Sequence, residues 1–226
     1  MTFIEPNNKE AQEIPKNKRY SVSIRLWHWL NFIVISGSLA TVLINATITD
    51  NRNVSGIISA ELQKNGVSLT AQQGKSAAHA LSDSVWAVHI YFGYVLAALF
   101  LFRIILEFFE LADQKLIRKI KAAYHQYHVI KQNRMLARHE LTVKSLYATF
   151  YVLLFIMVIT GLFLAFEDAL VAYRSIRHSV KEVHGFCMYL ILAFIFVHLL
   201  GVIMAEQKDG RGIVSDMING GDSSKA

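Results

Sequence analysis

The sequence predicts an all-α integral membrane protein, a four-helix bundle with both termini in the cytoplasm. Apolar and aromatic residues make up 54% of its 226 residues, and charged residues make up only 18%, against roughly 25% in an ordinary soluble domain. The apolar residues gather in four runs, each long enough for the roughly 20 helical residues that cross a hydrocarbon core. Lysine and arginine concentrate in alternate connections, which orients such helices.

The four runs predict membrane spans at about residues 25–48, 84–106, 145–166 and 183–205, within a single domain of residues 1–226. Four buried helices of a soluble protein are the alternative, but soluble helices need a polar face, and these runs lack one. A membrane strand barrel would alternate polar and apolar residues with a period of two, and these runs do not. The composition therefore favours four transmembrane helices.

The basic residues predict the orientation of these spans. Of the 23 lysines and arginines, 17 fall in the N-terminal tail with the edge of the first span, in residues 103–144 around the connection between the second and third spans, and in the C-terminal tail. The two other connections hold the remaining six. Positively charged connections stay in the cytoplasm, so we expect both termini there and an uncleaved first span. The net charge of +6 then reflects membrane topology, and no nucleic-acid partner is expected.

Two connections are long. The outer loop, residues 50–83, contains a helix-like patch around residues 69–81, and a loop of this length is usually functional or disordered. The inner connection, residues 107–143, is basic with interspersed apolar residues. It could continue the second helix into the cytoplasm or lie on the membrane surface.

Four of the nine histidines fall within the spans, where ionisable groups are costly and usually functional. By position, His89 and His184 lie at the outer depth, and we call them the outer pair. His28 and His198 lie at the inner depth and form the inner pair. His184 and His198 are fourteen residues apart, so on one helix they differ by roughly 40° in direction and about 21 Å in height. Both therefore point towards the same interior.

Such matched pairs are what two stacked bis-histidine haems need, because each iron takes one neutral imidazole from each of two facing helices. A covalently attached c-type haem is excluded, because the only cysteine is Cys187 and no Cys-x-x-Cys-His motif exists. Arg25 precedes His28 by one turn and could pair with haem propionates or serve as a membrane anchor. Arg103 has the same two interpretations. Small residues near the histidines could admit a flat macrocycle or serve helix packing: Gly93, Gly161, Gly185 and Gly201.

Three alternatives remain for the histidines. A single membrane histidine is often a packing or hydrogen-bonding residue. Four histidines at matched depths make this interpretation less attractive. A metal-transport path is possible because imidazole also binds zinc, copper and nickel. Such a path would require carboxylate or thiolate ligands at the same depth. A proton relay would need intramembrane carboxylates too, and the predicted spans contain none.

Two stretches resemble a known family. Residues 25–31, Arg-Leu-Trp-His-Trp-Leu-Asn, resemble the start of helix one in the b-type cytochrome subunit of nickel–iron hydrogenases, which belongs to the bacterial four-helix di-haem cytochromes b. The region from His184 to His198, with the tail through residues 215–220, is similar to the fourth helix and tail of these subunits. The resemblance implies two b haems with the pairing given above.

The resemblance also implies a quinone site near the inner haem, for which the candidates by position are Arg25, Asn31, His139 and Glu140. At the inner start of helix three the family pattern has Asn-Pro, whereas this chain has His139-Glu140-Leu141.

The function expected is electron transfer between an oxidoreductase partner outside the membrane, hydrogenase-like or other, and menaquinone or ubiquinone. The location expected is the inner membrane of a bacterium. The partner would supply the substrate chemistry, and this chain would be an electron-transfer subunit whose own activity is limited to quinone reduction or oxidation. Two alternatives stay open: a stand-alone cytochrome b acting as a quinone oxidoreductase, and a haem-free metal or proton transporter.

Overall fold

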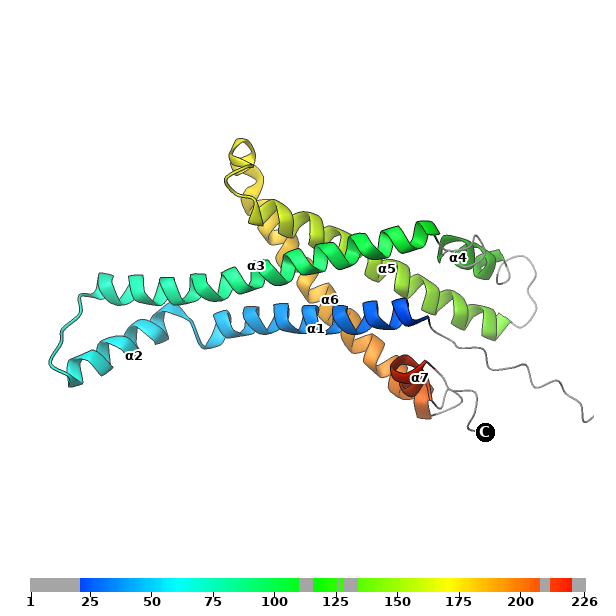
Figure 1. Ribbon diagram of the computed structural model, residues 1–226, viewed down its shortest axis with the longest axis horizontal. Coiled ribbons are helices and arrows are strands. Elements are labelled where there is room, and N and C mark those ends of the chain that lie inside the picture. The colour runs from blue at the N-terminus through cyan, green and yellow to red at the C-terminus, as the bar shows by residue number, and fades with distance from the viewer. Residues whose placement is uncertain (1–20, 110–115, 126, 128–133, 208–211, 221–226) are drawn as a thin grey trace, which may run out of the picture. The chain divides into compact units, whose positions relative to one another are not determined.

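A computed structural model describes residues 21–109, 116–125, 127, 134–207 and 212–220 (Figure 1). This part of the chain is helical and contains no strand, which confirms the all-α prediction. Four of its helices are long and apolar enough to cross a membrane: α1 (Val22–Thr47), α3 (Ala71–Phe109), α5 (Arg134–Ala165) and α6 (Arg177–Gln207). Shorter helices connect or follow them: α2 (Asn51–Lys64), α4 (Leu116–His125), the 3₁₀ helix η3 (Val171–Ile176) and α7 (Ile213–Asn219).

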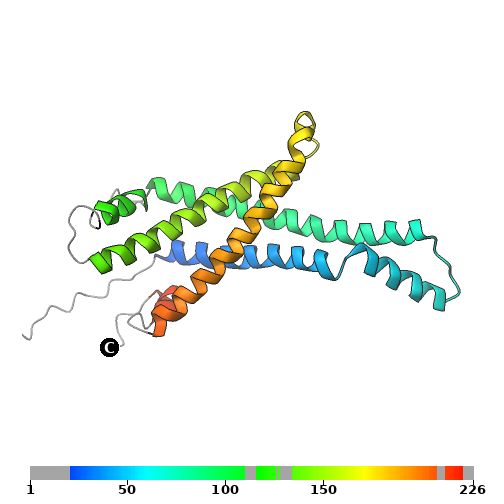
Figure 2. The same cartoon turned by 180° about the vertical axis from the view of Figure 1, so that it is seen from behind.

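The chain divides into two compact units, which are described separately. The larger unit, Leu30–Phe194, contains most of α1, all of α2 to α5, and the first half of α6. Within it α3 packs against α2 and α5, and α4 packs against α5 (Figures 1 and 2). The described residues of the smaller unit are 21–29, 195–207 and 212–220, so it holds the start of α1, the end of α6 and α7. Each unit contains one of the two histidine pairs.

The outer loop predicted from the sequence is largely helical. The Asp50 side chain accepts hydrogen bonds from two backbone amides at the start of α2, a typical N-cap. Thr70 and Gln73 bond reciprocally at the start of α3, with Gln73 Oε1 2.9 Å from the Thr70 amide, as in a capping box. Helix α3 therefore begins at Ala71, inside the patch that the sequence marks as helix-like, and continues without a break into the second span.

Helix α2 folds back along this first part of α3. Val54 and Ala78 are buried where the two helices meet. The approach is close, because a Cβ placed on Gly74 would lie 2.7 Å from Ser55 Oγ. With 39 residues, α3 is about 58 Å long, well beyond the roughly 30 Å of a hydrocarbon core. Its first turns and α2 thus form a helical hairpin that a span of ordinary length does not require.

The interior of the larger unit is lined by α1, α3, α5 and α6. Phe100 of α3 contacts Phe155 of α5, and Phe150 of α5 stacks on Phe194 of α6 with ring centres 4.6 Å apart. Cys187 is buried here as a free thiol, as expected of a small core residue. Only 11–17% of the residues in the most apolar window of each long helix are buried inside the protein. The apolar side chains left exposed therefore suit a lipid solvent.

Candidate functional site

The four span histidines meet as two pairs, and the pairs are the ones that the sequence predicts by depth. In the larger unit, His89 of α3 faces His184 of α6, with ring centres 6.4 Å apart and planes at 81°. In the smaller unit, His28 of α1 faces His198 of α6, with ring centres 6.3 Å apart and planes at 55°.

The separation of the rings suits a metal held between them. Imidazole–metal bonds are about 2.0 Å long and a ring nitrogen lies about 1.2 Å from its ring centre, so a metal between two opposed imidazoles separates the ring centres by about 6.4 Å. Both pairs show this separation. The same separation also occurs between packed aromatic rings such as Tyr91 and Tyr94, 6.4 Å apart, so the distance is compatible with a shared metal without requiring one.

Hydroxyl groups hold the outer pair. Thr160 Oγ1 of α5 lies 2.9 Å from His184 Nδ1, and Thr41 Oγ1 of α1 lies 2.9 Å from His89 Nδ1. The carbonyl oxygen of Ser38 is also 3.3 Å from His89 Nδ1. Contacts of this kind orient metal-binding imidazoles through the nitrogen that does not bind the metal. They leave Nε2 of both rings for a ligand.

The glycines near the outer pair divide into two kinds. A Cβ on Gly161 would lie 3.2 Å from His184 Cε1, so the ring of His184 uses the space that this glycine leaves. By contrast, a Cβ on Gly93, Gly185 or Gly201 would meet no atom within 4 Å. Helix packing therefore accounts for none of these three glycines. A flat macrocycle would meet no neighbouring atom at these three positions.

The inner pair lies beside a clasp formed by α7. Arg25 Nη1 donates to the carbonyl oxygen of Ile218 at 2.7 Å, and Trp29 Nε1 donates to that of Met217 at 3.2 Å. These carbonyls belong to the last turn of α7, where a cation is favourable. At the other end of α7, Glu206 of α6 accepts hydrogen bonds from the amides of Gly212 and Val214.

Helix α7 thereby joins the start of α1 to the end of α6, the two segments that carry His28 and His198. The sequence offered Arg25 as a haem-propionate or anchoring residue, and its contact with α7 is an additional role that only the structure reveals. Its Nε is buried without a hydrogen-bond partner, so the guanidinium retains a donor for an anionic group.

The structure gives less information about the other three quinone candidates. Asn31 is buried in α1. His139 and Glu140 belong to α5, but their side chains lie outside the described part of the chain. The structure therefore brings together no quinone site from these residues, and this assignment stays a prediction.

A polar cluster between α3 and α5 was not predicted. Arg103 Nη2 pairs with Glu107 Oε2 at 2.9 Å, and Arg103 Nε donates to the hydroxyl of Tyr151 at 3.0 Å. The Arg103 side chain is only 12% exposed. It is therefore not extended towards the membrane surface, as the anchoring interpretation of this residue would require. Glu107 went unnoticed because it falls one residue beyond the predicted second span. Its spacing of four from Arg103 was the available signal.

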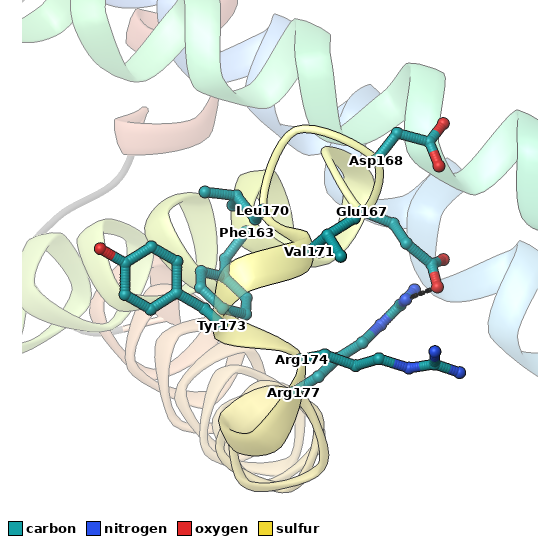
Figure 3. A pocket seen from close by; sticks show the side chains of 8 residues that line it. All are labelled: Phe163, Glu167, Asp168, Leu170, Val171, Tyr173, Arg174 and Arg177. Atoms are coloured by element: carbon teal, nitrogen blue, oxygen red, sulfur yellow. Dashed lines mark ion pairs between the residues drawn. The ribbon is translucent and has the colours of Figure 1, made fainter.

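A small pocket lies at the turn between α5 and α6 (Figure 3). Its volume is about 210 Å³, and Glu167 forms an ion pair with Arg177 at its edge. Arg174 extends on the same side as Arg177, whereas Tyr173 points the opposite way. None of the histidines lines this pocket, so the ion pair is best understood as closing the turn that leads into α6.

Comparison with known proteins gives the same family as the resemblance of residues 25–31 and of the fourth span with its tail. A family model described as prokaryotic cytochrome b561, the family of nickel-hydrogenase b-type cytochromes, matches residues 19–220. The chain belongs to the prokaryotic cytochrome b561 family. This makes it a multi-pass bacterial membrane protein that carries b-type haem and transfers electrons. No curated protein and no solved structure gives a significant match.

The donor set of this cytochrome b561 fits haem better than a bare ion. In the part of the chain that the structure describes, no group of three or more histidine, cysteine or carboxylate side chains could hold a metal. Zinc and similar ions need at least three protein ligands. Two opposed imidazoles suffice for iron in a porphyrin, because the macrocycle supplies the other four nitrogens. The residues present therefore fit the cofactor that the family implies.

Replacing Gly161 with alanine is expected to weaken haem retention at the outer pair roughly tenfold, the usual cost of disturbing a group that orients a metal ligand. The added methyl would press on Cε1 of His184 and turn the ring. The measurement is haem per chain after detergent washing. Gly56→Ala is the matched control, because a Cβ there meets nothing within 4 Å. Equal retention in both variants would contradict the role given to Gly161.

Proposed function

We propose that this cytochrome b561 holds two b haems, one at each histidine pair, and carries electrons between an oxidoreductase partner outside the membrane and the quinone pool. The observation that carries the proposal is the repeated opposition of two imidazoles at 6.3 and 6.4 Å. When bound, each haem would supply a one-electron iron couple. His89 and His184 would hold one, and His28 and His198 the other.

The remaining residues of each site would orient these ligands and exclude water. Thr41 and Thr160 fix the rings of the outer pair, and Gly161 gives His184 its space. At the inner pair, α7 and its contacts with Arg25 and Trp29 hold the histidine-bearing segments together. The whole chain would act as a single transmembrane domain of a bacterial inner membrane, with both termini in the cytoplasm. The basic residues support this orientation.

The outer pair would then face the partner, which the family name suggests is hydrogenase-like. Menaquinone or ubiquinone would exchange electrons at the cytoplasmic side, with Arg25, Asn31, His139 and Glu140 as the candidate contacts. The buried Nε of Arg25 supports its place in this set, because it is a donor without a partner. A stand-alone quinone oxidoreductase is the alternative, and copurification of a second redox subunit from native membranes would decide against it.

A haem-free transporter is disfavoured by the ligand set. A metal path would offer only two ligands at each pair among the described residues, fewer than zinc sites use. A proton relay has a carboxylate at Glu107, but that group is engaged in an ion pair with Arg103.

The test is a dithionite-reduced minus oxidised absorption spectrum of the detergent-purified chain, with haem and protein quantified on one sample. We expect a b-type α band and two haems per chain. A variant with alanine at all four histidines is the control and should lack the band. One haem per chain would refute the two-haem proposal. No haem in protein produced with ample haem supply would favour the transporter.

A further inference from the structure

The turn between α5 and α6 carries charged side chains that the proposed function does not use. Glu167, Asp168, Arg174 and Arg177 all line the pocket of about 210 Å³ at this turn. All four extend to the same side of the turn, whereas Tyr173 extends to the other (Figure 3). The pocket therefore offers two negative and two positive groups on one side, and their formal charges cancel.

Only one charge of each sign is used within the protein. Glu167 and Arg177 form an ion pair. The side chains of Asp168 and Arg174 are exposed, and neither has a hydrogen bond or ion pair with another residue in the part of the chain that the structure describes. A guanidinium matches the oxygens of a phosphate, and a carboxylate accepts hydrogen bonds from an ammonium group. The two unused charges thus suit a ligand that carries both a phosphate and an ammonium.

The same turn lies where two membrane-spanning helices reach the membrane surface. It follows α5 and leads into α6, which are both long and apolar enough to cross a bilayer. Four of its large apolar and aromatic side chains are 48–64% exposed: Phe166, Val171, Tyr173 and Ile176. Aromatic and apolar side chains at the end of a span are favourable at the lipid interface. The pocket is therefore at the depth of the lipid head groups.

The size of the pocket limits what can enter it. Sites for drug-sized molecules have volumes of roughly 300–1,000 Å³, whereas this pocket has about 210 Å³. It can hold a compact polar group but not a whole lipid. The acyl chains of a lipid bound here would remain outside, against the exposed apolar side chains of the turn.

We propose that this pocket binds the head group of a zwitterionic phospholipid with a primary ammonium, the phosphate at Arg174 and the ammonium at Asp168. An anionic phospholipid without an amine would leave Asp168 beside a negative charge, which selects against it. A choline head group has no N–H to donate to that carboxylate. The chemistry therefore favours phosphatidylethanolamine. A free phosphate would share only the contact with Arg174.

The test is a lipid competition on the full-length chain, purified in detergent and freed of bound lipid. Phosphatidylethanolamine, phosphatidylglycerol and phosphatidylcholine with identical acyl chains are added in equal amounts, and the lipids retained per chain are counted by native mass spectrometry. We expect phosphatidylethanolamine to be retained in preference to the other two. Equal retention of all three lipids would overturn the proposal.

Two variants assign the contacts. Arg174→Gln should weaken the retention of phosphatidylethanolamine roughly tenfold, the usual effect of losing a hydrogen bond to a charged group. Arg52→Gln is the matched control, because Arg52 is also an exposed arginine but lies on α2, outside the pocket. Asp168→Asn should abolish the preference for phosphatidylethanolamine over phosphatidylcholine, because an amide has no charge to pair with the ammonium.

Both variants should keep the helical content of the unmodified chain in circular dichroism, because neither side chain is hydrogen-bonded to another described residue. Unchanged retention in Arg174→Gln, or an unchanged preference in Asp168→Asn, would contradict the proposal. Inorganic phosphate is added in a separate titration and should not displace the lipid. Displacement by phosphate would show a site for a free anion and would overturn the lipid assignment.

Discussion

Replacing His184 with alanine is expected to lower the haem content from two per chain to one. His184 stands opposite His89 with ring centres 6.4 Å apart, and a single imidazole holds a non-covalent haem far less firmly than two. The helix itself should persist, because alanine is a better helix former than histidine and the apolar faces of α6 are unchanged. The measurement is haem per chain, with circular dichroism confirming the helical content.

His178→Ala provides the matched control for this loss. His178 is exposed in the first turn of α6, outside both pairs, and its replacement should leave two haems. The remaining haem of His184→Ala should have an unchanged midpoint potential. Retention of both haems in His184→Ala would show that the outer pair does not bind haem. Loss of both would show that the two sites depend on one another.

Double replacements test the pairing itself and should have the largest effect of all. His89→Ala combined with His184→Ala removes both ligands of one site, so this chain should still hold one haem. His89→Ala combined with His198→Ala removes one ligand from each site, so this chain should hold none. The two variants lose the same number of histidines. Their difference can therefore arise only from which histidines share an iron.

The comparison of the two double variants could also contradict the proposed pairing. If both double variants kept one haem, or if both lost all haem, the pairing of His89 with His184 would be wrong. A third chain, with His28→Ala and His198→Ala, should again hold one haem, whose midpoint should match one of the two midpoints of the unmodified chain. Haem per chain and a redox titration on the same preparations measure all three.

Much of the fold followed from composition alone. Runs of about 20 apolar residues have one stable form in a bilayer, because every backbone polar group must be bonded within the helix. The four long helices were therefore predictable, and so was the start of α3 near residue 70. The hairpin of α2 and α3 was less predictable from the sequence. Gly74 indicates a close approach of two helices only once α2 is known to pack against it.

The depths of the four histidines could also be predicted, because a helix advances by a constant rise per residue. Their partners beyond the pairs could not. Thr41 and Thr160 are ordinary residues in apolar runs, and nothing in their spacing connects them to histidines 48 and 24 residues away. Glu107 was missed because it lies just past a predicted boundary, and helix ends are the least certain part of a sequence-based assignment.

The sequence by itself determined that this protein is helical, spans a membrane and carries four histidines at two matched depths. Those properties depend on hydropathy and helical period, which are local. Only the tertiary structure decided that the rings of each pair stand 6.3 and 6.4 Å apart, that hydroxyls from α1 and α5 contact Nδ1 of His89 and His184, and that α7 joins Arg25 to Glu206. These contacts join residues far apart along the chain, so they depend on how the helices rotate and pack, which apolar patterns specify only loosely because lipid accepts any apolar face.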